Sequence, residues 1–363
     1  MTGNRRIRVL LVDDSPVVLE ILRRILSADA GFEVIGTARD GREGVEQAIA
    51  LAPDVVCTDL LMPVVDGLGL IERLMREQPM PILVVSDVVH ATDSANVFDL
   101  LAAGAVDVFP KPRGGFNVTS AAAEDLRRRV RLVAGVHVFR RRGGGTTDAS
   151  TAVATPPHLP ATSSVDGHGV VVIGASTGGP RGLARILSAL PRDYSLPVLI
   201  AQHISPGFEQ SLLDWLNGIG VLTVETATAG TRPRPGHAYL APEGCHLLVD
   251  SGGRLACPPD DGALYVPSVD RLFASAGRAH GSEVVAVLLS GMGVDGARAM
   301  RDLYDRGALT IVQDEETSVV FGMPGEAIRL GGAREILPIE AIGPYLAAVG
   351  AATRGASDEE ALA

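Results

Sequence analysis

Two blocks of alternating strand-like and helix-like segments, separated by a stretch of low complexity, constrain the fold of this chain. In each block, short apolar runs rich in β-branched residues, such as 7–12 and 170–173, precede longer segments of helical periodicity. This alternation is typical of βα units, in which parallel strands form a sheet covered by helices. The sequence therefore predicts an α/β protein with a mostly parallel sheet in each block.

The segment between the blocks predicts a linker. Residues 121–142 have a helical pattern, and Gly143 to Gly145 then open a stretch rich in Ser, Thr, Ala and Pro that ends near His168. Such a composition lacks the apolar periodicity of a core, and consecutive glycines are flexible. The predicted parts are an N-terminal domain at 1–125, a helical and then flexible linker at 126–168, a C-terminal domain at 169–352 and a frayed tail at 353–363.

Composition and charge exclude several classes of protein. The 363 residues suffice for two domains, and no apolar run approaches the roughly eighteen residues that a membrane span needs. The net charge of −11 disfavours nonspecific binding to nucleic acid, and three cysteines without a C-x-x-C pair indicate neither a disulfide framework nor a zinc site. The N-terminus lacks the pattern of a signal peptide. We therefore expect a cytoplasmic protein that neither binds DNA nor inserts into a membrane.

Polar residues follow the predicted strands of the N-terminal block. They stand at or just beyond the strand ends and are Asp13, Asp14, Asp59, Ser86 and Lys111. Because the carboxyl ends of parallel strands meet in one crevice, we expect these side chains to converge. Clustered carboxylates favour a hard cation such as Mg²⁺, and Asp59 is then placed to accept a phosphoryl group, with Lys111 and Ser86 beside its oxygens. The alternative is that these residues only cap the following helices.

The N-terminal motifs resemble the receiver domain of two-component response regulators. They are the acidic pair, residues 59–67 (DLLMPVVDG), Ser86 and Lys111-Pro112. The resemblance implies a flavodoxin-like (βα)5 fold, with Asp59 as phosphoacceptor, Mg²⁺ held by Asp13, Asp14 and Asp59, and Ser86 and Lys111 as the switch pair. One departure is Val108, which occupies a position where many receivers have an aromatic ring.

Ser176 is a candidate nucleophile in the C-terminal block. It lies in residues 174–179 (GASTGG), directly after the apolar run 170–173, and fits the G-x-S-x-G elbow in which a nucleophile stands on a tight strand-to-helix turn. A phosphate-binding loop or a plain turn are the alternatives. No lysine follows the glycines as in a P-loop, and the spacing is not that of dinucleotide-binding folds.

Two further strand ends offer partners for this serine. His203 follows the strand-like residues 197–202, and Asp295 follows 284–289 within the glycine-rich segment 290–296. The three together have the composition of a Ser-His-Asp triad, although a structural histidine and a helix-capping aspartate remain alternatives. The chain order Ser, His, Asp differs from that of α/β-hydrolases, so we expect a different doubly wound α/β fold.

The C-terminal motifs resemble the catalytic domain of the chemotaxis methylesterase family, CheB. They are residues 174–179, Gln202-His203, residues 267–270 (PSVD), residues 290–296 and residues 321–324 (FGMP). The resemblance implies that Ser176 is the nucleophile, His203 the general base and acid, and Asp295 the residue that orients it. It further implies backbone N–H groups of Thr177 and Met292 as oxyanion donors, and no cofactor for the esterase.

The two resemblances together imply a function. They indicate an esterase that removes γ-methyl groups from glutamates of chemoreceptor cytoplasmic domains, deamidates certain glutamines, and is activated when the histidine kinase CheA phosphorylates Asp59. In the unphosphorylated state, the receiver would cover the esterase crevice. Two alternatives stay open, namely the same chemistry in a sensory array unrelated to motility, and a response regulator with a non-catalytic binding domain as its output.

Overall fold

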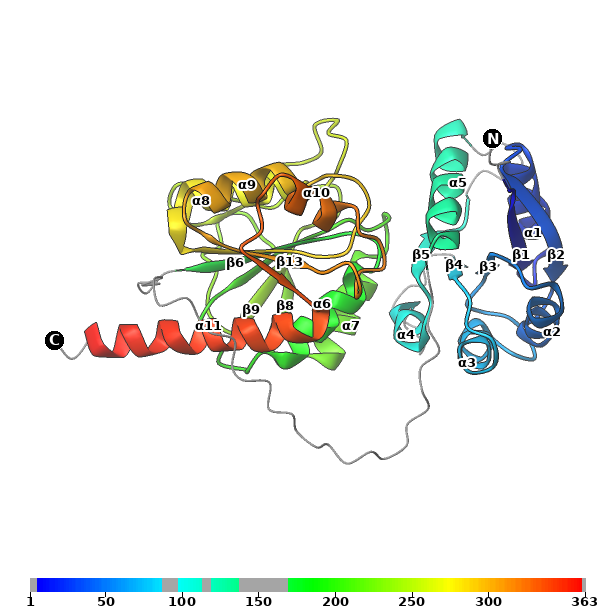
Figure 1. The fold of residues 1–363 in the computed structure, drawn as a ribbon, viewed down its shortest axis with the longest axis horizontal. Helices are drawn as coiled ribbons and strands as arrows, with labels where there is room; N and C mark the ends of the chain where they lie inside the picture. The colour runs from blue at the N-terminus through cyan, green and yellow to red at the C-terminus, as the bar shows by residue number, and fades with distance from the viewer. Residues whose placement is uncertain (1–4, 87–96, 113–118, 137–168, 361–363) are drawn as a thin grey trace, which may run out of the picture. The chain divides into compact units, whose positions relative to one another are not determined.

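The computed structural model describes residues 5–86, 97–112, 119–136 and 169–360, which fall into two compact units (Figure 1). The flexible part predicted for the linker, 143–168, lies outside these residues. None of the described helices is both long and apolar enough to cross a membrane.

The N-terminal unit alternates five strands with five helices. The elements are β1 (Ile7–Val12), α1 (Pro16–Ser27), β2 (Phe32–Ala38), α2 (Gly41–Leu51), β3 (Val55–Thr58), α3 (Gly67–Glu77), β4 (Ile82–Ser86), α4 (Val97–Ala103), β5 (Asp107–Pro110) and α5 (Ser120–Ala134). The strands form a parallel sheet of order β2-β1-β3-β4-β5, with α1 and α5 on one face and α2, α3 and α4 on the other (Figure 1). The predicted (βα)5 fold is confirmed.

Helix α5 extends beyond the predicted end of the N-terminal domain. Leu126, Val130 and Val133 are buried and recur on one helical face, which packs against β3, β4 and β5. Arg129 also forms an ion pair of 2.6 Å with Asp107 at the start of β5. The boundary predicted between residues 125 and 126 therefore falls inside the fifth helix of this unit.

The C-terminal unit is built on seven strands. Its elements are β6 (Val170–Ala175), α6 (Gly179–Ala189), β7 (Val198–Gln202), α7 (Glu209–Ile219), β8 (Thr223–Thr226), β9 (His237–Leu240), β10 (Leu248–Val249), β11 (Leu255–Ala256), α8 (Val269–His280), β12 (Val284–Leu288), α9 (Ala297–Asp305), β13 (Leu309–Gln313), α10 (Met323–Arg329), β14 (Glu335–Leu337) and α11 (Ile339–Glu360). Seven strands form a parallel sheet of order β14-β13-β12-β6-β7-β9-β8, and β10 and β11 form a separate antiparallel pair. Helices cover both faces, as predicted for a doubly wound fold (Figure 1).

The last helix continues into the predicted tail. Helix α11 ends at Glu360, although the polar and small residues from Thr353 onward were predicted to fray. Thr353 is buried, and its hydroxyl donates a hydrogen bond of 3.0 Å to the carbonyl of Val349 one turn earlier. Arginine and glutamate, which occur here as Arg354, Glu359 and Glu360, favour a helix, so the polar composition of this segment does not exclude one.

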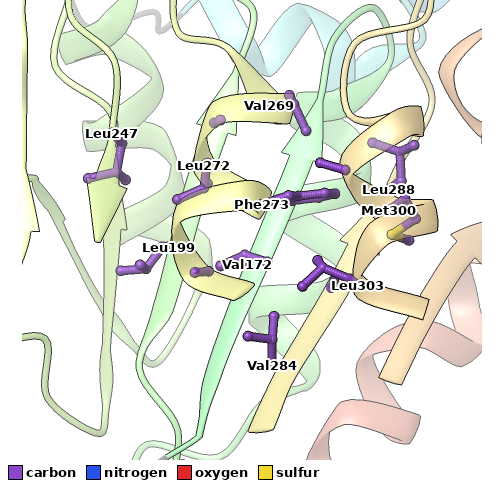
Figure 2. Close-up of a cluster of buried hydrophobic side chains, with 14 of the residues drawn as sticks. Val172, Leu199, Leu247, Val269, Leu272, Phe273, Val284, Leu288, Met300 and Leu303 are labelled. Atoms are coloured by element: carbon purple, nitrogen blue, oxygen red, sulfur yellow. The ribbon is translucent and has the colours of Figure 1, made fainter. Parts of the chain in front are cut away.

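A buried apolar cluster fixes α8 and α9 over the sheet (Figure 2). Phe273 of α8 and Met300 of α9 pack with Val172 of β6 and Leu288 of β12, and all four side chains are fully buried. Burial of each such side chain stabilises the fold by about 1.5–3 kcal/mol. This packing holds the N-terminus of α8 above the carboxyl ends of the central strands.

Candidate functional sites

Ser176, His203 and Asp295 lie at the carboxyl ends of three neighbouring strands. Ser176 follows β6, His203 follows β7, and Asp295 lies in the turn between β12 and α9. Strand β6 pairs with β7 on one side and with β12 on the other, so the chain order reverses at β6. Crevices at such reversals are the usual ligand sites of open parallel sheets.

A hydrogen bond of 2.9 Å joins His203 Nε2 to Asp295 Oδ2. Because Nε2 faces a carboxylate, neutral His203 carries its proton there, and Nδ1 is left as a proton acceptor. Within the described residues, the Ser176 hydroxyl forms no hydrogen bond to this ring. Bonds of this kind often tighten only when substrate binds.

The N-terminus of α8 holds the carboxylate of Asp295. The backbone N–H groups of Val269 and Asp270 donate hydrogen bonds of 2.8 and 2.9 Å, and Ser268 Oγ donates one of 3.2 Å. Burial acts to raise the pKa of Asp295, but the bonds from His203 and from the helix outweigh it, so the pKa is lowered. The carboxylate is therefore ionised and fixed in orientation.

Two glycines allow the turn at Ser176 to close tightly. Gly178 has a φ of +80°, and a Cβ there would lie 2.6 Å from Val319 Cβ. A Cβ on Gly291 would lie 2.7 Å from Ser176 Cβ and 2.3 Å from Met323 Sδ. Only glycine fits at either position, so the turns after β6 and β12 approach each other closely at the serine.

The two predicted oxyanion donors lie in these turns. The N–H of Ser176 donates to Ser290 O at 3.1 Å, and Ser290 Oγ donates to Thr177 O at 2.8 Å, which ties the turns together. Thr177 is buried and Met292 half-buried. The N–H of Met292 has no hydrogen-bond acceptor in the part of the chain that the structure describes. This N–H is therefore available to a ligand.

Sequence reasoning gave no separate role to two residues of this site. Gln202 Nε2 donates hydrogen bonds of 2.9 Å to the carbonyls of both Ser176 and His203. The ring of Tyr265 stacks on the His203 ring, with 5.1 Å between centroids and an interplanar angle of 3°. Gln202 stood in a quoted motif, whereas Tyr265 lies among turn residues with no periodicity to single it out.

In the N-terminal unit, the structure brings the predicted acidic residues together. Carboxylate oxygens of Asp13, Asp14 and Asp59 lie within 4.8 Å of one another, and Lys111 Nζ lies 2.8 Å from both Asp13 Oδ2 and Asp59 Oδ2. Burial raises the pKa of Asp13, although Lys111 opposes this. An all-oxygen donor set with a buried carboxylate fits Mg²⁺, whose charge would offset the cost of ionising Asp13.

The predicted switch residues flank this cluster. Ser86 is buried at the end of β4, and its carbonyl accepts a hydrogen bond of 3.0 Å from the N–H of Lys111. Burial acts to lower the pKa of Lys111, but the carboxylates of Asp13 and Asp59 outweigh it, so the pKa is raised. Lys111 is therefore a fixed cation. Val108 is buried in β5.

Comparison with known proteins gives the family. A model of the CheB methylesterase family matches residues 171–346, and a response regulator receiver model matches residues 9–122. A protein-glutamate methylesterase/protein-glutamine glutaminase of Geobacter metallireducens is 45% identical over 93% of this chain and 96% of its own length. This chain belongs to the CheB methylesterase family. Another CheB relative with the same description, from Hahella chejuensis, is 44% identical over 91% of this chain and 94% of its own length.

The two matches give this CheB chain a receiver followed by a methylesterase domain, in the order of its two units. A crystal structure of the Thermotoga maritima CheB methylesterase catalytic domain is 36% identical to the part it matches. It covers 50% of this chain and 98% of its own, with a TM-score of 0.49.

Proposed function

We propose that this protein hydrolyses glutamate γ-methyl esters on chemoreceptors, deamidates specific glutamines there, and serves adaptation in chemotaxis. The relatives named protein-glutamate methylesterase/protein-glutamine glutaminase support the substrate class. The observation that carries the proposal is the bond of 2.9 Å between His203 and Asp295 at the strand end beside Ser176. It supplies a base with a defined tautomer next to a serine in an elbow turn.

The proposed reaction is acyl transfer through Ser176. His203 Nδ1 accepts the serine proton while Oγ attacks the γ-carbonyl carbon, and the N–H groups of Thr177 and Met292 stabilise the oxyanion. His203 then returns the proton to the leaving methoxide, and methanol departs. A water molecule, deprotonated by His203, attacks the acyl carbon. His203 then gives this proton to Ser176 Oγ as the bond between Oγ and the acyl carbon breaks, and glutamate is released. With a glutamine side chain, ammonia leaves in place of methanol.

The proposed control lies in the receiver. Asp59 accepts a phosphoryl group from a histidine kinase, and Lys111 and Ser86 bind the phosphoryl oxygens. Asp13, Asp14 and Asp59 would hold Mg²⁺, which neutralises charge on the transferring group when bound. The unphosphorylated receiver blocks the esterase crevice, and phosphorylation releases it. A linker keeps the two domains at high effective concentration, so a modest contact suffices.

Release of methanol from methylated chemoreceptor tests the serine chemistry. Ser176→Ala removes the nucleophile, and we expect the rate to fall by at least about 10³-fold. Ser188→Ala is the matched control, because Ser188 is exposed on α6 and its hydroxyl, within the described part of the chain, bonds only to the carbonyl of Arg185. This control should release methanol at the wild-type rate. Equal release by wild type and Ser176→Ala would reject the nucleophile assignment.

A further inference from the structure

We propose that Tyr265 is a positioning residue, whose aromatic ring holds the plane of the His203 imidazole so that Nδ1 faces Ser176. The inference rests on the proposed function, because it concerns the same proton transfer. It starts from the nearly parallel stack of the two rings, 5.1 Å apart at an angle of 3°.

His203 needs such a contact because, among the residues that the structure describes, its ring has a single hydrogen bond. The bond from Nε2 to Asp295 fixes one atom of the imidazole. It does not by itself fix the rotation of the ring about the Cβ–Cγ bond, which sets the position of Nδ1. Rotation of a histidine ring about its last torsion has only broad minima. A flat neighbour on one face restricts this rotation, and stacked aromatic pairs contribute about 0.5–1.5 kcal/mol.

Tyr265 is itself held on two sides. Its hydroxyl end lies over Gly293, where a Cβ would come within 2.6 Å of Tyr265 Oη, and Gly293 has a φ of +88° that favours glycine. On its C-terminal side, Pro267 and Ser268 are buried and lead into α8. The start of that helix holds Asp295. One short segment, 265–270, thus orients both the base and the carboxylate.

The aromatic ring, and not the hydroxyl, carries this contact. Within the described residues, Tyr265 Oη forms no hydrogen bond, so its loss removes no bond from the site. The structure therefore predicts a difference between an aromatic and an aliphatic substitution. Tyr265→Phe keeps the stacked ring, whereas Tyr265→Leu replaces it with an apolar side chain that has no planar face.

The test measures kcat and KM for methanol release by the full chain carrying each substitution. We expect Tyr265→Phe to stay within about twofold of wild type, and Tyr265→Leu to lose about 10- to 100-fold in kcat with little change in KM. The rate at which a sulfonyl fluoride modifies Ser176 should fall in the same proportion, because it needs the same base. Tyr265→Met repeats the test if the leucine variant fails to fold.

Three outcomes would overturn the proposal. They are an unchanged kcat in Tyr265→Leu, a rise in KM alone, and an equal loss in Tyr265→Phe, which would assign the effect to the hydroxyl. Ser176→Ala, assayed beside them, distinguishes failure of the proposed serine chemistry from failure of the positioning role of Tyr265. Retained activity in that variant would reject the proposed serine chemistry, whatever the Tyr265 variants show.

Discussion

Asp13, which we propose holds Mg²⁺, shows how a single buried carboxylate lowers the stability of the receiver. Burial raises its pKa above the ordinary value of 3.8, despite the neighbouring Lys111. An acid whose pKa is higher in the folded protein stabilises the fold fully below the unfolded pKa, and this contribution is lost as the pH rises through the folded pKa. At neutral pH without a divalent cation, the ionised carboxylate therefore destabilises the receiver.

We accordingly expect Asp13→Asn to raise the unfolding temperature of the receiver at pH 7 in EDTA. The amide keeps the acceptor for the N–H of Ser15 and removes the buried charge. The difference should shrink toward pH 4, and added Mg²⁺ should stabilise the variant less than wild type. Thermal unfolding at both pH values checks this, with Glu33→Gln on the exposed side of β2 as control. A variant less stable than wild type at pH 7 in EDTA would contradict the argument.

Val64 is a second residue that is costly for stability. It is β-branched, 76% exposed, and has a φ of +67°, a backbone region that such side chains rarely adopt. We expect Val64→Gly to stabilise the receiver by about 1 kcal/mol, because relief of strain exceeds the entropy that glycine loses. Val64→Ala keeps the Cβ and should gain less. Urea unfolding measures the free energy of unfolding of both variants. A Val64→Gly variant less stable than wild type would contradict the expectation that Val64 is strained.

At the scale of elements, the contact between two turns shapes the candidate esterase site. Gly291, after β12, lies so close to Ser176, after β6, that a Cβ there would press on the serine and on Met323. We expect Gly291→Ala to lower kcat by at least about tenfold, since a shift of about 1 Å suffices for a larger loss.

Gly218 provides the matched control for that prediction. It lies in α7, and a Cβ there would meet no atom within 4 Å. Gly218→Ala should keep full activity and stabilise the helix by up to about 1 kcal/mol. Methanol release and thermal unfolding of both variants check the pair. Equal kcat values for Gly291→Ala and Gly218→Ala would show that the turns after β6 and β12 can move apart without loss of activity.

The sequence predicted the strands and their ends well, for a physical reason. Central parallel strands are buried on both faces, so they form unbroken apolar runs, and the polar residue after each run marks the edge of the sheet. These polar residues include Asp59 and Lys111, which form an ion pair in the structure. They also include His203 and Asp295, which share a hydrogen bond.

The supporting contacts could not be predicted in the same way. Ser268 and Ser290 bind residues far away in the sequence, and Tyr265 likewise stacks on a distant residue, His203. Only folding brings these segments together. In contrast, the extension of α5 past residue 125 could be predicted from the sequence. The spacing of Leu126, Val130 and Val133 indicates a buried helical face among the arginines.

At the scale of the whole molecule, the two sites belong to separate compact units. The acidic cluster lies in the first unit, and the serine, histidine and aspartate lie in the second. A phosphorylation event at Asp59 can therefore change catalysis only if the first unit acts on the second. Couplings between distinct sites are commonly about 5- to 150-fold, which an activity assay resolves easily.

The decisive measurement is methanol release from methylated chemoreceptor by the full chain, with and without acetyl phosphate and Mg²⁺. We expect the phosphodonor to raise the wild-type rate by at least about tenfold, and to change the rate of Asp59→Asn by less than about twofold. Ser176→Ala should release no methanol above background under either condition. An equal rise in wild type and Asp59→Asn, or release by Ser176→Ala, would contradict a serine esterase controlled by its receiver.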